Sequence, residues 1–182
     1  MSYLFRSERL GFRNWLDADI PKMAAISSDE DVMEFFPWLA TFEQTRDFVL
    51  KMQEMFDERD YCYFAVDLLE ENKFNGFIGL AYQVYEAPFT PCVDIDWRLA
   101  KEFWGKGYAT EGASRCLSYA FEDLGIEEIK STAPRMNLPS LNVMKKIGMS
   151  MELEFTHSRL PQESPLADFL CYGISRDIIK PS

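Results

Sequence analysis

The sequence contains very little histidine, and its few cysteines are scattered. His157 is the one histidine among 182 residues, and no CxxC pair occurs among the four cysteines, Cys62, Cys92, Cys116 and Cys171. A zinc site needs several Cys or His ligands at short spacings, and a Ser-His-Asp triad needs an exposed, correctly partnered histidine. We therefore predict no metal site, reduced and mostly buried cysteines, and no hydrolase of the triad type.

Long apolar runs and an excess of positive charge are also absent. No run reaches the roughly 18 apolar residues of a membrane span, and the N-terminus lacks the features of a signal peptide. The net charge is −11, which argues against nucleic-acid and anionic-membrane surfaces because these need clustered Lys and Arg. We expect a cytoplasmic protein without nucleic-acid or membrane partners. The acidic charge suits a cationic acceptor such as an amine, although it also simply favours solubility.

What the chain does have is ample apolar surface. Hydrophobic residues make up 47% of it and aromatic residues 15%. No internal repeat or Pro/Gly/Ser-rich linker divides it, and its length suits one core better than two. We predict a single domain over residues 1–182.

Hydrophobic periodicity predicts alternating strands and helices. Strands are expected at 7–15, 61–69, 74–85, 91–99, 127–134, 150–157 and 168–175. Helices are expected at 17–26, 29–37, 42–56, 108–124 and 137–148. This order predicts an α/β fold with a mixed sheet and antiparallel hairpins at its flanks.

The stretch "WGKGYAT", residues 104–110, lies between a predicted strand and a predicted helix. It delivers Gly105, Lys106 and Gly107 to a helix N-terminus, where unpaired N–H groups and the helix dipole favour a phosphate. Glycines at such a place are more often only a turn, so the stretch alone does not decide. The spacings of the Rossmann fingerprint and of the Walker loop are absent, which removes dinucleotide and nucleoside-triphosphate roles.

A longer stretch carries a family resemblance. Residues 94–149, "DIDWRLAKEFWGKGYATEGASRCLSYAFEDLGIEEIKSTAPRMNLPSLNVMKKIGM", resemble the acetyl-CoA-binding core of the GNAT acyltransferase superfamily, in the variant of ribosomal-protein N-terminal acetyltransferases. The stretches "SERLGFRNW" and "GFIGLAYQVY" are similar to the same branch. The resemblance implies an α+β fold in which helices flank a mostly antiparallel, twisted sheet of about seven strands. A splayed central strand pair would bind CoA.

The resemblance also implies cofactor contacts. The strand around "VDIDWRL" would carry a bulge and bind the pantetheine arm through the backbone of Trp97, Arg98 and Leu99. Asn137 would contact the CoA arm, and Ser140 would lie near the thioester sulfur. The pyrophosphate would be held by the loop of Trp104, Gly105, Lys106, Gly107, Tyr108, Ala109 and Thr110.

Acyl transfer to an amine needs a base, an oxyanion donor and an acid. The resemblance implies Asp94 as the base and the backbone N–H of Trp97 as the oxyanion donor. Period-two alternation places Asp94, Asp96 and Arg98 on one strand face. Relatives commonly carry glycine at Asp96, so either the acceptor pocket is more acidic here or the bulge differs. An equally weighted alternative is that Asp94 or Asp96 only pairs with Arg98.

The acid departs from the family pattern. Many relatives use a tyrosine seven residues after the asparagine, where this chain has Met144. The role passes to Ser140 or to water, although Asn137 and Ser140 could also simply cap a helix. His157 is a second-rank base acting through water. The acceptor pocket could be lined by Phe35, Phe36, Trp38 and Tyr85, for which ordinary core packing is the default expectation.

The resulting hypothesis is an N-acetyltransferase that moves an acetyl group from acetyl-CoA, without a metal, to a primary amine by direct attack in a ternary complex. The acceptor is a protein N-terminus or a small molecule, and homodimer formation is left open. One alternative is a catalytically silent CoA-binding or sensor module on the same fold. Another is a structural domain with no cofactor.

Overall fold

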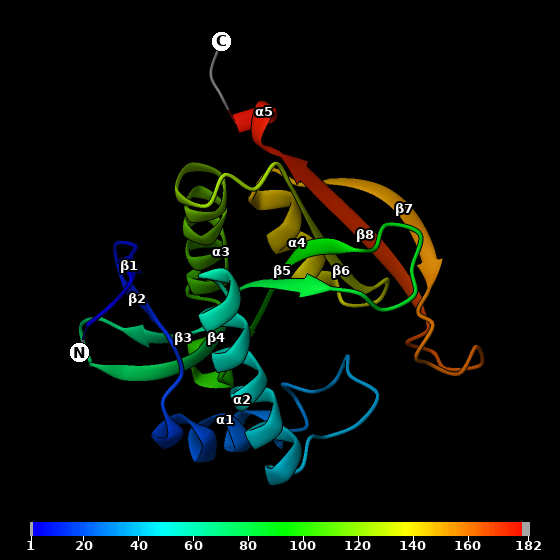
Figure 1. Ribbon diagram of the computed structural model, residues 1–182. Coiled ribbons are helices and arrows are strands. Elements are labelled where there is room, and N and C mark those ends of the chain that lie inside the picture. Colours follow the sequence, from blue (N-terminus) through cyan, green and yellow to red (C-terminus); the bar gives the residue numbers. More distant parts are fainter. Residues whose placement is uncertain (1, 180–182) are drawn as a thin grey trace.

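The computed structural model describes residues 2–179 and contains one eight-stranded sheet (Figure 1). The strands are β1 (Phe5–Arg6), β2 (Leu10–Arg13), β3 (Tyr63–Leu68), β4 (Lys73–Gln83), β5 (Cys92–Leu99), β6 (Glu128–Pro134), β7 (Ser150–Thr156) and β8 (Asp168–Ser175). Their order across the sheet is β1-β2-β3-β4-β5-β6-β8-β7. Neighbouring strands are antiparallel except β5 and β6, which are parallel. The mixed, mostly antiparallel sheet confirms the predicted fold class.

The helices cover both faces of this sheet. They are α1 (Ile20–Ser27), α2 (Phe42–Arg59), α3 (Tyr108–Ser118), α4 (Leu138–Lys146) and α5 (Arg176–Ile179), and α3 continues into a π-helical turn, Tyr119–Asp123. Figure 1 shows α1 and α2 side by side. No helix within residues 2–179 is long and apolar enough to cross a membrane.

Adjacent residues of β4 show which helix lies on which face. The ring of Phe77 packs against Phe48 of α2, with 5.4 Å between ring centroids. Ile78, the next residue, points to the opposite face and meets α3. Gly112 allows this approach, because a Cβ there would lie 2.3 Å from Ile78 Cδ1. The α1 and α2 layer therefore lies on one side of the sheet and α3 on the other.

The centre of the sheet opens between its two parallel strands. β5 and β6 are in register only at Asp94 and Lys130, next to a hydrogen bond of 2.9 Å from the Ser131 hydroxyl to the Ile95 carbonyl. Beyond this point β5 and β6 no longer pair with each other, although β5 continues as far as Leu99. The separation agrees with the splayed pair expected for CoA. The prediction of a bulge in β5 was wrong where β5 pairs with β4, because these two strands stay in continuous register.

Two local predictions near the N-terminus were wrong. The strand predicted over 7–15 is confined to β2, and residues 7–9 form a turn that joins β2 to an additional strand, β1. Ser7 Oγ closes this turn by accepting from the Leu10 amide at 3.2 Å. This turn explains eight strands instead of seven. The helix predicted over 29–37 is a series of turns. Asp29 Oδ1 accepts from the amides of Asp31 and Val32, and this local bonding competes with a regular helix.

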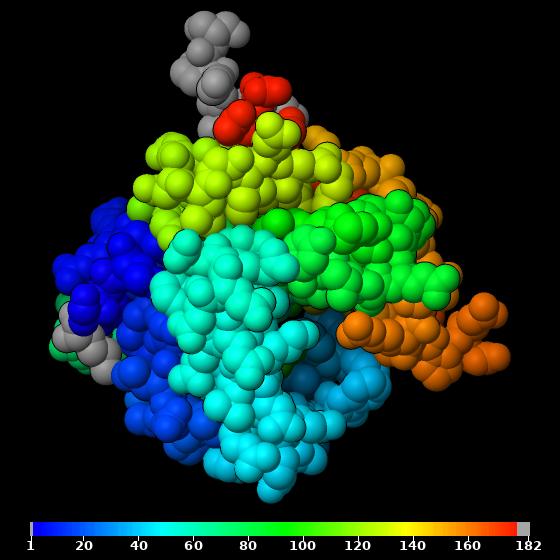
Figure 2. All heavy atoms as spheres, in the orientation of Figure 1, coloured from blue at the N-terminus to red at the C-terminus, as the bar shows by residue number. Residues whose placement is uncertain are grey.

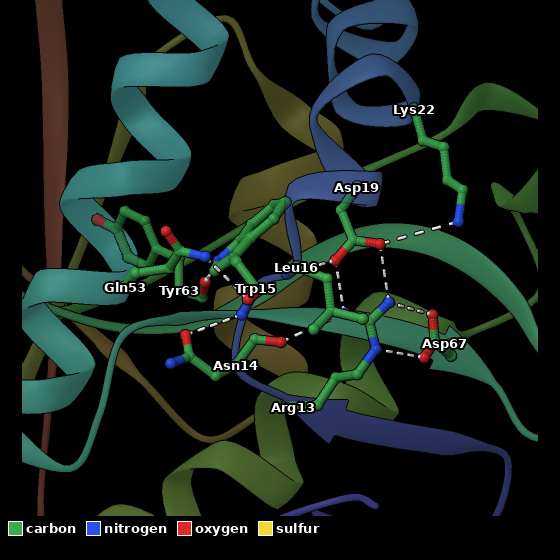
Figure 3. A network of polar contacts seen from close by, with 9 residues as sticks. All are labelled: Arg13, Asn14, Trp15, Leu16, Asp19, Lys22, Gln53, Tyr63 and Asp67. Atoms are coloured by element: carbon green, nitrogen blue, oxygen red, sulfur yellow. Dashed lines mark hydrogen bonds and ion pairs between the residues drawn. The ribbon is translucent and has the colours of Figure 1, made fainter. Parts of the chain in front are cut away.

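A buried ion network joins the start of α1 to the sheet (Figure 3). Arg13 donates to Asp19 Oδ2 at 2.5 Å and to both oxygens of Asp67 at 2.7 and 2.9 Å. All three side chains are almost fully buried. The indole of Trp15, two residues along, donates to the Tyr63 carbonyl at 2.6 Å. Trp15 thus holds the backbone of Tyr63, the first residue of β3, next to this network.

Replacing Asp67 with asparagine should destabilise the protein by about 2 kcal/mol, because a neutral amide then faces a buried guanidinium. Asp19 would still neutralise Arg13, which keeps the loss below that of an unpaired charge. Urea unfolding followed by circular dichroism would measure the change. Asp47→Asn is the control, since Asp47 is exposed. Equal unfolding midpoints for Asp67→Asn and the parent would contradict the expected stabilising role.

Candidate active site

The glycine loop adopts the shape of an anion cradle at the start of α3. Gly105 and Gly107 have φ of +74° and +83°, and Gly107 is the residue that precedes the first turn of the helix. A Cβ at Gly105 would meet no atom within 4 Å, and one at Gly107 would meet only Arg9 Nη2, at 3.5 Å. The space beside these two Cα atoms is therefore open to a ligand.

Residues from the β1–β2 turn brace this loop. Arg9 donates to Glu111 Oε2 at 2.6 Å and to the Lys106 carbonyl at 3.0 Å, and its guanidinium lies 4.4 Å from the Tyr108 ring centroid. The Ser7 hydroxyl also donates to Glu111, at 2.6 Å. Arg9 and Lys106 place two cations beside the helix N-terminus. Sequence reasoning missed Arg9 and Glu111, because they are 102 residues apart.

Asp94, Asp96 and Arg98 lie on one face of β5, which we call the Asp94 face, as strand alternation predicted. Tyr63 Oη donates to Asp94 Oδ1 at 2.7 Å. Gln83 Nε2 donates to Asp94 Oδ2 at 3.1 Å. Asp94 is thus oriented by two side chains and remains half-buried. Neither partner was predicted, because the register of β3, β4 and β5 decides that they meet.

Both carboxyl groups of the Asp94 face hold protons more tightly than ordinary aspartates. Burial, together with the neighbouring Asp96 charge, raises the pKa of Asp94 to about 7, even though the hydrogen bonds from Tyr63 and Gln83 lower it. The pKa of Asp96 is raised to about 6, because the effect of burial exceeds the lowering by the Arg98 charge and the Trp97 amide. Asp94 therefore changes protonation near neutral pH, as a general base should.

These raised values predict a pH-dependent stability cost. A carboxyl whose folded pKa exceeds its unfolded value of about 3.9 binds more protons in the folded state, so stability falls as pH rises from about 4 to about 7. Asp96→Asn should raise the melting temperature at pH 8 and have little effect at pH 4. Asn can still accept from the Trp97 amide. A lower melting temperature for Asp96→Asn at pH 8 would contradict this assignment of the cost to burial.

The pairing of these carboxylates with Arg98 does not occur. Among residues 2–179, neither Asp94 nor Asp96 lies within ion-pair distance of Arg98. Arg98 stacks instead over Phe36, with 4.2 Å from the guanidinium carbon to the ring centroid. The alternative that made the aspartates simple partners of Arg98 is therefore wrong for this structure.

The backbone amide of Trp97 is already bonded. It donates to Asp96 Oδ1 at 2.7 Å. A thioester oxygen that used this amide would have to replace the carboxylate. The GNAT resemblance predicts glycine at Asp96, and a glycine has no carboxylate to compete for this amide.

The start of α4 is capped as expected. Asn137 Oδ1 accepts from the Ser140 amide at 3.2 Å, and this confirms the capping role. Ser140 is half-buried. Met144, on the next turn, is buried with 1% of its surface exposed. Asn137 and Ser140 stay candidates for CoA contacts.

His157 lies just after β7 in an aromatic cluster. Its ring stacks on Tyr85 with 5.0 Å between centroids and lies 4.9 Å from Phe169. Its Nδ1 accepts from the Arg159 amide at 3.2 Å, and burial followed by the Arg159 charge lowers its pKa. These are the contacts of a packed side chain. Within the described residues, none of its hydrogen bonds or ring contacts reaches Asp94 or Asp96.

The cysteines do not supply a nucleophile at neutral pH. Burial raises the pKa of Cys92 to about 11 and that of Cys171 to about 12. Burial raises the pKa of Cys62 and Cys116 too. All four are free thiols. The reactive thiolate form is therefore scarce.

Comparison with known proteins identifies the family. Residues 9–150 match the family model described as "Acetyltransferase (GNAT) domain". The chain belongs to the GNAT acetyltransferase family. It is 32% identical over 169 residues to YnaD, an uncharacterised N-acetyltransferase of Bacillus subtilis (strain 168), covering 92% of this chain and 94% of YnaD. The GNAT resemblance of the sequence and the acetyl-CoA-dependent acetyltransferase activity are thereby confirmed.

Solved structures agree with this placement. The crystal structure of a GNAT-family acetyltransferase from Bacillus anthracis has a TM-score of 0.77 and 31% identity, covering 94% of this chain and 98% of that one. A ribosomal-protein-S5-alanine acetyltransferase from Vibrio fischeri has a TM-score of 0.74 at 20% identity, covering 97% and 98%. The second likeness shows the shared fold. The acceptor of this GNAT protein must be argued from its own residues.

Proposed function

We propose that this GNAT protein, as one domain over residues 1–182, acetylates a primary amine by direct attack on acetyl-CoA in a ternary complex, with Asp94 as general base. The observation that carries the proposal is the state of Asp94. Its pKa is about 7, it is half-buried, and Tyr63 and Gln83 hold its two oxygens. An amine enters protonated at neutral pH, and a carboxylate of this pKa can accept its proton.

The residues expected to hold acetyl-CoA fit that role. The glycine loop offers open backbone amides and two neighbouring cations for the pyrophosphate. The unpaired edge of β5, at Trp97, Arg98 and Leu99, suits the pantetheine arm, and Asn137 and Ser140 lie at the start of α4. When bound, acetyl-CoA supplies the thioester that the amine attacks.

Three further residues serve the proton transfers and the stabilisation of charge. Asp94 takes the proton of the amine, and the Trp97 amide stabilises the developing oxyanion once Asp96 has released it. The departing thiolate takes a proton from Ser140 or from water, and the second proton that the nitrogen loses as the amide forms replaces it. A covalent acyl-cysteine route is disfavoured because burial keeps the cysteines protonated.

Purified protein with acetyl-CoA and a panel of amines would test the proposal. Release of the CoA thiol, together with an acceptor heavier by one acetyl group, is the expected result. Tight CoA binding with no release for any amine would favour the silent sensor module, which the occupied Trp97 amide makes a specific alternative. Calorimetry showing no CoA binding would overturn the cofactor assignment as well.

A further inference from the structure

Arg98 is a half-buried cation that has no anionic partner among residues 2–179. Its guanidinium lies between Phe36 and Phe77, 4.2 and 5.5 Å from their ring centroids. Its Nη1 donates weakly to the Ser27 hydroxyl, at 3.3 Å. Its Nε is buried and finds no hydrogen-bond partner within residues 2–179. Removing a guanidinium from water without pairing it is costly, so a missing counter-ion is expected here.

The nearest acidic group is not that counter-ion. Asp96 influences Arg98 electrostatically but lies beyond ion-pair distance, and it accepts from the Trp97 amide instead. No other carboxylate of the described chain pairs with Arg98. The partner is therefore expected from a ligand.

The CoA phosphates are poor candidates for this partner. Arg98 pairs across the sheet with Phe77, whose ring faces α2, so its side chain lies on the α1 and α2 side. The glycine loop begins α3, which packs on the opposite face through Gly112 and Ile78. Arg98 and Asp94 share a strand face, about 13 Å apart between Cα atoms. An acceptor whose amine reaches Asp94 can therefore extend along the same strand face toward Arg98.

We propose that Arg98 binds a carboxylate of the acceptor, so that this enzyme acetylates small amines that also carry a carboxylate, such as amino acids. This inference rests on the proposed function. The Nε and Nη2 edge of the guanidinium is the one left unbonded by the described residues, and that edge matches the two oxygens of a carboxylate. A polyamine would fit poorly, because its second ammonium would meet the Arg98 charge.

Access to Arg98 is compatible with a small molecule. Phe36 belongs to the connection between α1 and α2, and Figure 2 shows the surface hollowed beside this connection, next to α2. Ser27, which bonds Arg98, is the last residue of α1.

Matched acceptors would test the role of Arg98. The common amino acids, β-alanine and 4-aminobutyrate would be compared with alkylamines of equal length and with 1,4-diaminobutane. The parent should favour the carboxylate-bearing member of a pair by a factor on the order of 10 to 100 in kcat/KM, the range expected for a charge-assisted pair. Arg98→Gln should bring this ratio close to one, mainly through KM, and Arg98→Lys should restore part of it.

Several results would overturn the inference. One is a preference of the parent for alkylamines or the diamine. Another is that Arg98→Gln lowers kcat/KM equally for both members of a pair. Calorimetric titration of the amino acids into the parent saturated with CoA gives a readout without turnover. If an amino acid binds to the parent, Arg98→Gln removes this binding and no acceptor is acetylated, the carboxylate site is supported and the transferase proposal is rejected. No binding and no acetylation of any amino acid would reject the carboxylate site, while acetylation of other amines would retain the transferase.

Discussion

Asp94→Asn is expected to lower turnover by about 100- to 10,000-fold, the usual contribution of a positioned general base. Asparagine keeps the shape of the side chain and an oxygen for the Tyr63 hydroxyl, but it cannot take a proton from the amine. Acetyl-CoA affinity should change far less than turnover, because the proposed donor contacts lie in the glycine loop and along the edge of β5. Steady-state kinetics and calorimetric titration of CoA would measure the two quantities.

The pH profile gives a sharper test of the same residue. With Asp94 as base, kcat/KM of the parent should rise with pH and level off above about 7, where Asp94 is ionised. Without it, only solvent can deprotonate the amine, so the profile of Asp94→Asn should move to higher pH. Asp96→Asn is the matched comparison on the same strand face. A larger loss in Asp96→Asn would assign the base to Asp96, and parental activity in Asp94→Asn would show that Asp94 is not the base.

Gly107→Val should abolish measurable acetyl-CoA binding while most of the fold survives. Gly107 has φ of +83°, where a β-branched residue is strained, and it immediately precedes the first turn of α3. Relief of that strain would turn the loop amides away from a bound pyrophosphate. The new side chain would also stand beside Arg9 at the open face of the loop. Calorimetric titration of CoA would measure the loss.

A second glycine supplies the control for this variant. Gly125 has φ of +67°, and a Cβ there would meet no atom within 4 Å. Gly125→Val therefore carries similar backbone strain at the far end of the helical segment that begins with α3. It should lower stability while leaving CoA affinity near the parental value. Equal affinity for Gly107→Val and the parent would mean that the glycine loop is only a turn.

Local signals were enough for most elements of the fold. The helix predicted from residue 42 begins there as α2, and its capping box joins Thr41 and Gln44, which lie within one helical turn. Asn137 caps α4 for the same reason. The prediction was wrong where a short polar side chain bonded its own neighbours, as Ser7 does in the β1–β2 turn and Asp29 before α2. The spacing of apolar residues in strands and helices does not reveal that such local hydrogen bonds compete with regular structure.

The candidate site shows the same division. The sequence placed Asp94, Asp96 and Arg98 on one face because strand alternation is a local property. It assigned the glycine loop through the GNAT resemblance. It missed Tyr63 and Gln83 because the register across three strands decides which side chain reaches Asp94.

The sequence by itself therefore determined the family, the donor substrate and the strand that carries the Asp94 face. These follow from residues close together along the chain. Only the tertiary structure decided the raised pKa of Asp94 and the lack of an ion-pair partner for Arg98 among residues 2–179, because burial and ion pairing depend on segments distant in sequence. Asp94 and Arg98 lose much of their contact with water only when the sheet packs against α2. Their burial sets what the site can bind.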